Sequence, residues 1–305
     1  MKRINLDLVR VTEAAAIAAS QWIGSGDKLS ADKAATEAMR ERLNRVNFTG
    51  RIVIGEGKKD KSAGLFAGER VGNPSPGSPV LDIAVDPIEG TRPTVTSGPE
   101  ALSVLAVAEQ GALFETGEFY MSKLAYGPAI ASRVKLNLKD PISVTIEKVG
   151  KAISKQASKI KVCILDRPRH EKMIEELRGL GVRIQLIQDC DVSGAIATCM
   201  PESGIDLLFG IGGAPEGVIT ACAIKCLRGG FEAQVIDEKT LQVADPKVYG
   251  IEDLAGGQCA FTATGITNGS LLSGVRYTNR RAITHSLFMR SESGTVRWIT
   301  AHHEY

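Results

Sequence analysis

The six residues Asp86-Pro87-Ile88-Glu89-Gly90-Thr91 combine two carboxylates, a glycine and a hydroxyl. They follow the apolar run 80–85, which predicts a buried strand. Carboxylate oxygens are preferred ligands of Mg²⁺ and Mn²⁺, and free main-chain N–H groups beyond a strand can hold phosphate oxygens. A hydroxyl beside the metal ions can orient an attacking water. The motif therefore predicts metal-assisted phosphate chemistry; the alternative is a proline-stabilised turn with surface acids.

Further acids occupy comparable places at the ends of expected strands or helices. Asp32 opens an expected helix, Glu56 lies between glycines after an expected strand, and Glu216 lies between a strand and a helix. Acids at helix starts also favour the helix dipole, so helix capping is an equal explanation for Asp32 and Glu216 taken singly. Clustered with Asp86 and Glu89, however, such acids would repel one another unless cations lay among them. The set therefore predicts a site for several Mg²⁺ or Mn²⁺ ions.

The first half of the chain must supply the elements that position these acids. An Ala-rich helix is expected over 6–22, and Ser30 is expected to cap a second helix that ends near Leu43, with Asp32 in its first turn. The segment 72–79 is too rich in Gly and Pro for anything but a loop. Strands are expected at 51–54, 80–85 and 101–108.

After about residue 150, short strands and helices alternate, which predicts a mainly parallel sheet with helices on its faces. Parallel sheets bind ligands beyond the carboxyl ends of their strands. Here those ends carry Arg167, Asp189 and Gly213. The expected strands are 161–166, 183–188, 205–210 and 231–236, and the expected helices are 171–178, 192–199 and 217–228.

Bulk composition excludes several classes of protein. The 305 residues include 37 basic and 35 acidic side chains, and a net charge of +2 provides no strong basic field for nucleic acid. No apolar run reaches the roughly 18 residues that a membrane span needs, and the first residues lack the pattern of a signal peptide. We expect a cytoplasmic protein with no nucleic-acid or membrane partner. Its cysteines form no CxxC pair, which predicts free thiols in a reducing compartment: Cys163, Cys190, Cys199, Cys222, Cys226 and Cys259.

These motifs, taken in order, resemble the class II fructose-1,6-bisphosphatase (GlpX) family. The segment 86–91 alone would indicate only the wider lithium-sensitive, inositol-monophosphatase-like superfamily. Gly212–Val218 and the C-terminal segment narrow the assignment. The similarity covers nearly the whole chain, and its segments are 26–28, 31–32, 54–57, 86–91, 120–124, 212–218, 262–267 and 297–303.

The resemblance implies an α/β fold of the layered sugar-phosphatase type, α+β in its first half and mainly parallel in its second. It implies hydrolysis of the 1-phosphate of fructose 1,6-bisphosphate with two or more Mn²⁺ or Mg²⁺ ions. The implied ligands are Asp32 and Glu56 for one ion, and Asp86, Glu89 and Glu216 for another. The candidate catalytic residues are Thr91, to aim the water, Glu56, as proton acceptor, Asp86 and, by its context, Lys28.

Substrate contacts are implied in both halves. The guanidinium groups of Arg167 and Arg169 suit a distant phosphate, Asp189 and Asp191 can accept from sugar hydroxyls, and Cys190 has no expected chemical role. Residues 1–150 are then a metal-binding catalytic subdomain, and 151–305 are a sugar- and second-phosphate-binding subdomain with the C-terminal segment. The implied contact residues are Glu89, Gly90, Thr91, Tyr120, Arg167, Pro168, Arg169, Asp189, Cys190, Asp191 and Gly213.

Alternatives stay open at this point. The same chemistry can act on sedoheptulose 1,7-bisphosphate, alone or beside fructose 1,6-bisphosphate, or on an inositol monophosphate. A dinucleotide-binding dehydrogenase is disfavoured because Pro215 interrupts the glycine pattern that begins at Gly210. A non-enzymatic sugar-phosphate sensor would not need the full set of acids with Thr91. The family resemblance also implies a homo-oligomer, either a dimer or a tetramer.

Overall fold

The computed structural model describes residues 4–57, 64–117 and 119–304. The chain divides into two compact units. Unit 1 is formed by 1–115 together with 256–305, and unit 2 is formed by 116–255. The sequence instead places a boundary near residue 150. The difference arises because the C-terminal strands return to the sheet of unit 1, whereas Tyr120–Tyr126 pairs with strands of unit 2.

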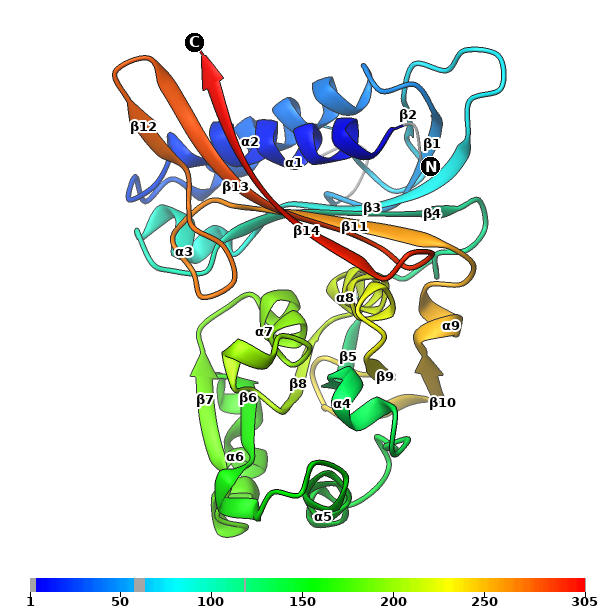
Figure 1. Ribbon diagram of the computed structural model, residues 1–305, viewed down its shortest axis with the longest axis vertical. Coiled ribbons are helices and arrows are strands. Elements are labelled where there is room, and N and C mark those ends of the chain that lie inside the picture. The colour runs from blue at the N-terminus through cyan, green and yellow to red at the C-terminus, as the bar shows by residue number, and fades with distance from the viewer. Residues whose placement is uncertain (1–3, 58–63, 118, 305) are drawn as a thin grey trace. The chain divides into compact units, whose positions relative to one another are not determined.

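Unit 1 contains a long sheet covered on one face by helices α1 (Asn5–Ser20) and α2 (Lys28–Leu43) (Figure 1). The sheet order is β12-β13-β11-β4-β3-β1-β2, with β14 paired to β13. β1 and β3 are parallel, and the other pairs are antiparallel. The strands are β1 (Thr49–Ile54), β2 (Arg70–Val71), β3 (Val80–Glu89), β4 (Leu102–Glu109), β11 (Cys259–Gly265), β12 (Arg276–Thr278), β13 (Arg281–Arg290) and β14 (Thr295–Glu304).

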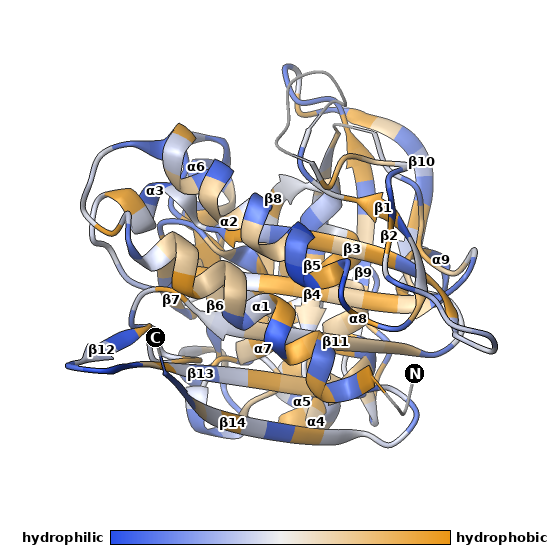
Figure 2. Ribbon diagram, turned by 90° about the horizontal axis from the view of Figure 1, so that it is seen from above, coloured by the Kyte–Doolittle hydropathy of each residue, from blue (hydrophilic) through white to orange (hydrophobic). Residues whose placement is uncertain are grey.

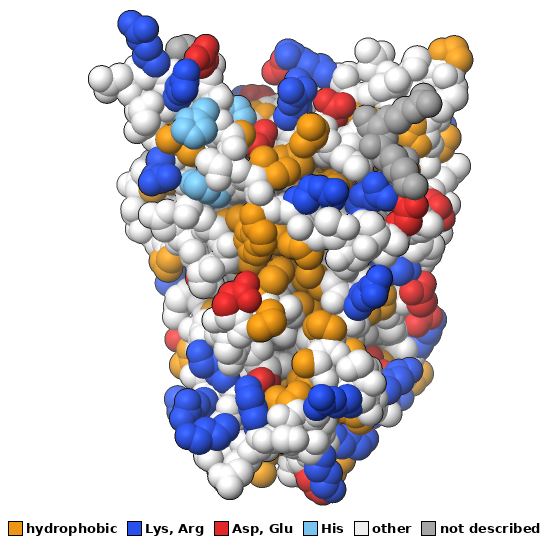
Figure 3. Space-filling view, viewed as in Figure 1, with side chains coloured by type: hydrophobic (Ala, Val, Ile, Leu, Met, Phe, Trp, Pro, Cys, Tyr) orange, Lys and Arg blue, Asp and Glu red, His pale blue; other side chains and the backbone are white. Residues whose placement is uncertain are grey.

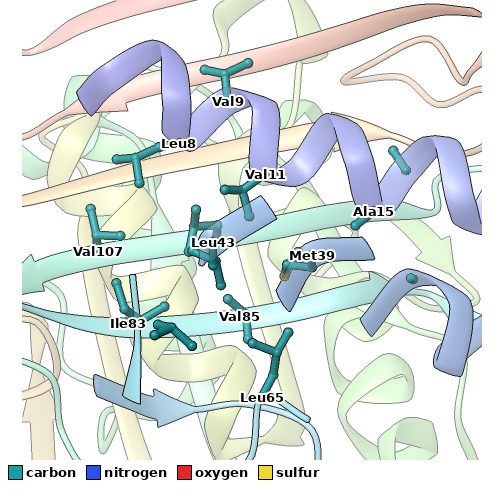
Figure 4. Packing of buried hydrophobic residues seen from close by; sticks show 14 of the residues in the cluster. Leu8, Val9, Val11, Ala15, Met39, Leu43, Leu65, Ile83, Val85 and Val107 are labelled. Atoms are coloured by element: carbon teal, nitrogen blue, oxygen red, sulfur yellow. The ribbon is translucent and has the colours of Figure 1, made fainter. Parts of the chain in front are cut away.

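The core of unit 1 lies between this sheet and the helices. β3 and β4 are buried along nearly their whole length and are largely apolar in Figure 2. Their sequences are therefore continuous hydrophobic runs. Figure 4 shows how α1 and α2 direct apolar side chains towards these strands. Removing that apolar surface from water stabilises the unit by about 25 cal/mol per Å². Residues of this core include Leu8, Val11, Met39, Leu43, Ile83, Val85 and Val107.

The start of α2 differs from the expectation. The helix begins at Lys28, and Asp27 caps it by accepting a hydrogen bond from the Ser30 N–H at 3.1 Å. Ser30 is therefore inside the first turn and is not the N-cap. Asp32 consequently lies beyond the first turn. The carboxylate of Asp27 prevails as the cap because it accepts from both the N–H and the hydroxyl of Ser30.

Unit 2 is built on a sheet of order β10-β9-β5-β8-β6-β7. β7, β6 and β8 are parallel, as expected, but β5 lies antiparallel between β8 and β9, so the sheet is mixed rather than mainly parallel. A second apolar core packs around Leu124, Val162 and Leu207. The strands are β5 (Tyr120–Tyr126), β6 (Lys161–Leu165), β7 (Arg183–Ile187), β8 (Leu207–Gly213), β9 (Gly230–Ile236) and β10 (Val243–Gly250).

The helices of unit 2 follow the expected alternation with the strands. α6 (Glu171–Gly179), α7 (Asp191–Ala197) and α8 (Ala214–Cys226) occupy the three predicted helical segments. The remaining helices are α4 (Pro128–Ala131), α5 (Ile142–Ile153) and α9 (Ile251–Leu254), with the 3₁₀ helices η2 (Ala157–Lys159), η3 (Pro168–His170) and η4 (Pro201–Ser203). The predicted α/β class is thus confirmed.

Two further predictions concern the whole chain. All six cysteines are buried, as expected. Within the described residues, no helix combines the length and apolarity that would cross a membrane. Histidine side chains gather on the hairpin of β13 and β14, visible in pale blue in Figure 3.

Candidate active site

The end of β3 carries the two acids Asp86 and Glu89. The strand continues through Asp86 to Glu89, further than expected, with a register shift against β4 between these residues. Asp86 Oδ1 accepts a hydrogen bond from the Ile88 N–H at 2.9 Å, and Glu89 is buried. An oxygen of Asp86 and an oxygen of Glu89 lie within 4.8 Å of each other. These two neighbouring carboxylates offer oxygen atoms as ligands, and such a donor set suits a hard divalent cation such as Mg²⁺ or Mn²⁺.

Gly90 makes the turn that presents Thr91. Its φ of 98° lies in the left-handed region, which a residue with a side chain rarely adopts. The short helix α3 (Thr91–Val95) starts directly after it, and the Gly90 carbonyl accepts from both the N–H and the hydroxyl of Thr94. These bonds fix the main chain of Thr91 immediately beyond the two acids.

Thr91 and Asp32 are hydrogen-bonded, a contact that the sequence did not reveal. Thr91 Oγ1 donates to Asp32 Oδ1 at 2.9 Å, which joins α3 to α2. Burial raises the pKa of the Asp32 carboxyl, while the Thr91 hydrogen bond and the charge of Lys28 oppose that rise. Because the hydroxyl proton is directed to Asp32, the lone pairs of Thr91 Oγ1 can accept a hydrogen bond from another group, such as a water molecule.

Glu56 lies at the same edge of the sheet as Asp86. β1 and β3 are parallel, and Ile54 pairs with Ala84. Glu56 and Asp86 are each two residues beyond that pair, so parallel pairing brings both acids to one end of unit 1. The Glu56 N–H donates to the Leu65 carbonyl at 2.9 Å, which anchors this segment. Unit 1 therefore assembles Asp32, Glu56, Asp86, Glu89 and Thr91 from α2, β1, β3 and α3.

Unit 2 carries Glu216 in the first turn of α8, directly after β8. Burial is the largest influence on its carboxyl and raises its pKa; the charge of Lys123 opposes the rise, and that of Asp191 adds to it. Tyr120 of β5 pairs with Gly213 at the end of β8. The predicted residues Tyr120, Gly213 and Glu216 thus meet at one end of the unit 2 sheet.

The arginines after β6 lie at this end as well. Arg169 Nε donates to the Ile211 carbonyl at 2.9 Å, and its guanidinium lies 5.1 Å from the centroid of the Tyr120 ring. Arg167 forms an ion pair with Asp189. Pro168 opens the short 3₁₀ turn that separates the two arginines. The Nη groups of Arg169 are not used in its bond to Ile211.

Sequence reasoning gave Cys190 no role, but its backbone matters. Its φ of 68° is left-handed, which is unusual for a residue other than glycine. Cys190 is the N-cap residue of α7. Asp189 before it pairs with Arg167, whereas Asp191 after it accepts from Lys123. The turn at Cys190 thus sends two neighbouring carboxylates to different cations.

Sequence reasoning also assigned no role to Lys123 and His170. Lys123 lies inside β5, is 1% exposed and donates to Asp191 Oδ2 at 2.7 Å. His170 is fully buried, and its Nε2 accepts from the Ile211 N–H at 2.7 Å. Burial, with the charge of Arg169 as the next cause, lowers the pKa of His170 to about 4. A charged residue within an apolar strand was the available signal for Lys123.

An α/β fold that presents carboxylates and an ordered threonine beyond a strand, with arginines beyond another, defines a phosphatase of the metal-dependent class. Comparison with known proteins narrows this class. The family model described as "Bacterial fructose-1,6-bisphosphatase, glpX-encoded" matches residues 2–303. The chain therefore belongs to that family.

Individual relatives agree with the family match. "Fructose-1,6-bisphosphatase 1 class 2" from Escherichia coli strain K12 is 41% identical over 324 residues, covering 99% of this chain and 95% of that protein. "Fructose-1,6-bisphosphatase class 2" from Shigella flexneri shows the same identity and coverage. The recognition made from the motifs is thus confirmed.

Proposed function

We propose that this protein hydrolyses the 1-phosphate of fructose 1,6-bisphosphate, yielding fructose 6-phosphate and inorganic phosphate in sugar-phosphate metabolism and gluconeogenesis. The observation that carries the proposal is the 41% identity with a class 2 fructose-1,6-bisphosphatase over 99% of the chain. The arrangement of Asp32, Thr91, Asp86 and Glu89 within unit 1 supports it, because these residues combine an ordered hydroxyl with neighbouring carboxylates.

The family chemistry depends on divalent metal ions, and the oxygen-only donor set of this chain suits Mn²⁺ or Mg²⁺. We assign Asp32 and Glu56 to one ion, and Asp86, Glu89 and Glu216 to another. When bound, such ions neutralise charge on the transferred phosphoryl group and lower the pKa of a bound water towards about 7.

The chain's own residues then direct the water and hold the substrate. Thr91 donates a hydrogen bond to Asp32, so its oxygen accepts a hydrogen bond from the attacking water and aims that water at phosphorus. Glu56 takes the proton that the water loses. The N–H groups of Gly90 and Thr91 hold oxygens of the 1-phosphate. Lys28 remains a candidate catalytic residue on its charge near Asp32.

Unit 2 supplies the groups for the sugar and the second phosphate. Arg169 can offer its Nη donors to the 6-phosphate, because its Nε is the group bonded to Ile211. Arg167 and Asp189 form a neutral pair beside it, and Tyr120 supports the guanidinium of Arg169. Asp191 accepts a hydrogen bond from a sugar hydroxyl. Gly213 has no side chain, so the substrate can approach its main chain closely.

A phosphate-release panel tests the proposal. Fructose 1,6-bisphosphate, sedoheptulose 1,7-bisphosphate, fructose 1-phosphate and inositol 1-phosphate are each assayed with Mn²⁺ and with Mg²⁺. We expect the highest kcat/KM with fructose 1,6-bisphosphate and complete loss of activity in EDTA. A higher kcat/KM for inositol 1-phosphate, or no phosphate release with any metal, would reject the proposal. Comparable values for both bisphosphates would establish dual specificity.

We also propose a cytoplasmic homo-oligomer, either a dimer or a tetramer. Six buried cysteines, with no CxxC pair among them, support a reducing compartment. Light scattering coupled to size-exclusion chromatography measures the assembly, and a mass near 32.5 kDa would contradict it. Fractionation of the native host tests the compartment.

A further inference from the structure

Lys123 is a buried lysine of unit 2 to which the proposed function gives no role. It lies in the middle of β5, which pairs with β8 on one side and β9 on the other. Its side chain is 1% exposed, and its Nζ donates to Asp191 Oδ2 at 2.7 Å. A buried ammonium is costly unless it is paired, and an apolar residue at this position would avoid that cost. Such a pair therefore requires a reason beyond stability.

The surrounding chain leaves room for this ion pair. A Cβ atom at Gly212 of β8 would lie 2.5 Å from Asp191 Oδ2 and 3.1 Å from Lys123 Nζ. Both distances are too short for ordinary contact, so any larger residue at position 212 would displace the pair. A Cβ at Gly217 would lie 3.6 Å from Lys123 Cε, an ordinary contact distance. The position of the Asp191 carboxylate is thus limited by Lys123 on one side and by Gly212 on another.

The main chain at Asp191 is also held in place. Asp191 is the first residue of α7 and follows the left-handed Cys190. The Ser193 hydroxyl and the Gly194 N–H both bond to the Cys190 carbonyl, which holds this turn. With its backbone fixed and Oδ2 bonded to Lys123, Asp191 can turn only Oδ1 towards a ligand. A carboxylate oxygen held in this way is an oriented hydrogen-bond acceptor.

We propose that Lys123 is a positioning residue for substrate binding: it holds the Asp191 carboxylate in one orientation, so that Oδ1 accepts a hydrogen bond from a sugar hydroxyl. This inference rests on the proposed function and adds a residue to it. Lys123 itself touches no substrate. A carboxylate that rotates freely loses this oriented acceptor, and substrate binding weakens while the bond-breaking step is unchanged.

The competing role for Lys123 acts through Glu216. The charge of Lys123 also lowers the pKa of Glu216, so its loss could weaken metal binding instead of sugar binding. The two roles predict different readouts. Action through Asp191 changes KM for the sugar bisphosphate, whereas action through Glu216 changes the Mn²⁺ concentration that gives half-maximal activity.

The test measures kcat, KM and the half-activating Mn²⁺ concentration for wild type and variants. Lys123→Met and Asp191→Asn should each raise KM for fructose 1,6-bisphosphate by about 10- to 100-fold, the range expected for a lost hydrogen bond to a charged group. kcat and Mn²⁺ activation should change little. The double variant should show a KM no higher than that of either single variant, because both act on one contact.

Matched variants separate positioning from folding. Lys148→Met removes a lysine whose ion pair with Asp140 has the same 2.7 Å distance, lies in the same unit and is more exposed; its KM should stay at the wild-type value. Gly212→Ala keeps both charges but pushes Asp191 aside, and should raise KM as Lys123→Met does. Lys123→Arg should recover part of the lost binding. Gly212→Ala and Lys123→Arg keep the proposal testable if Lys123→Met does not fold.

Each outcome decides between the hypotheses. An unchanged KM in Lys123→Met or in Gly212→Ala overturns the inference. Additive effects of Lys123→Met and Asp191→Asn overturn it as well, as does a variant that alters only Mn²⁺ activation. If wild-type protein releases no phosphate from fructose 1,6-bisphosphate, the proposed function fails first, and the positioning role fails with it. Retained wild-type activity with normal variants rejects the positioning role alone.

Discussion

The two units treat their carboxylates differently. In unit 1, Asp32 is bonded to a hydroxyl and Asp86 to a main-chain N–H, and further acids share the same edge of the sheet. In unit 2, Asp189 and Asp191 are each bonded to the side chain of a cation. Neutral donors orient a carboxylate without cancelling its charge, whereas an ion pair removes that charge from the local field.

The difference indicates a division of tasks. A set of acids that keeps its charge attracts cations from solution, as a metal site must. A set of acids neutralised by lysine and arginine can meet polar, uncharged groups such as sugar hydroxyls without repelling a nearby phosphate. If this comparison is correct, loss of the acids of unit 1 should affect chemistry, whereas loss of Asp189, Asp191 or the cations paired with them in unit 2 should affect binding.

The largest effect is expected from Glu89→Gln in unit 1. The change keeps the shape of the side chain but removes charge from a proposed metal ligand. Loss of groups that merely support ligands costs about 10- to 100-fold, so we expect kcat to fall by more than about 100-fold with an unaltered circular dichroism spectrum. Glu115→Gln, at an exposed acid of the same unit, should retain full activity. Glu89→Gln with more than a tenth of wild-type kcat would contradict the charge-based role of unit 1.

Thr91→Ala should come next. The hydroxyl bonded to Asp32 is removed, and a positioned group that handles a proton contributes about 10²- to 10⁴-fold. We expect kcat to fall by about 100-fold while KM changes much less, and Thr91→Ser to recover most of the rate. Thr96→Ala removes a hydroxyl near the same helix that donates to the Arg92 carbonyl, and serves as the control. A near-native kcat for Thr91→Ala would remove Thr91 from the mechanism.

Arg169→Lys tests the binding side of the comparison. Lysine keeps the charge but loses the planar fork that suits phosphate. KM for fructose 1,6-bisphosphate should rise about tenfold with little change in kcat. Fructose 1-phosphate lacks the distant phosphate and should be nearly insensitive to the change. Equal losses for both substrates would show that Arg169 does not contact the 6-phosphate.

The smallest effect concerns the stability of unit 2 in acid. Burial lowers the pKa of His170 from 6.5 to about 4. Between these values the unfolded chain binds the proton more readily, so the free energy of unfolding falls as pH falls from 6.5 towards 4. The loss should reach about 2 to 3 kcal/mol.

Hydrogen exchange of peptides from β6 and β8 measures this loss, because Ile211 of β8 donates to His170. His170→Gln, which retains an acceptor, should flatten the pH dependence, whereas His302→Gln on β14 should leave it unchanged. An equal pH dependence in wild type and His170→Gln would show that acid sensitivity arises elsewhere.

The sequence predicted well wherever one local pattern decides the structure. The apolar runs before Glu56 and Asp86 became β1 and β3, and the alternation after residue 150 became β6 to α8. Continuous apolar segments bounded by Gly and Pro carry that information without tertiary context. The motif 86–91 indicated the wider superfamily for the same reason, since its residues are contiguous, and Gly212–Val218 with the C-terminal segment narrowed it to the family that the model matches.

The sequence failed where distant segments compete. Tyr120–Tyr126 has no local signal to place it between β8 and β9, and the pairing of β4 with β11 joins residues more than 150 positions apart. The bond from Thr91 to Asp32 and the pairing of Lys123 with Asp191 have the same character. Ser30 lost the role of N-cap to a carboxylate three residues earlier, a choice that spacing alone does not decide.

The interrupted path of unit 1 has a consequence for synthesis of the chain. Unit 2 is one continuous segment and can complete its fold as soon as it leaves the ribosome. Unit 1 emerges first but must wait for β11, which pairs with β4 along seven residues. Until then β4 is an open apolar edge that can recruit other chains. The unit that carries the proposed catalytic threonine is thus begun first and finished last, and nascent chains are most prone to aggregation during that interval.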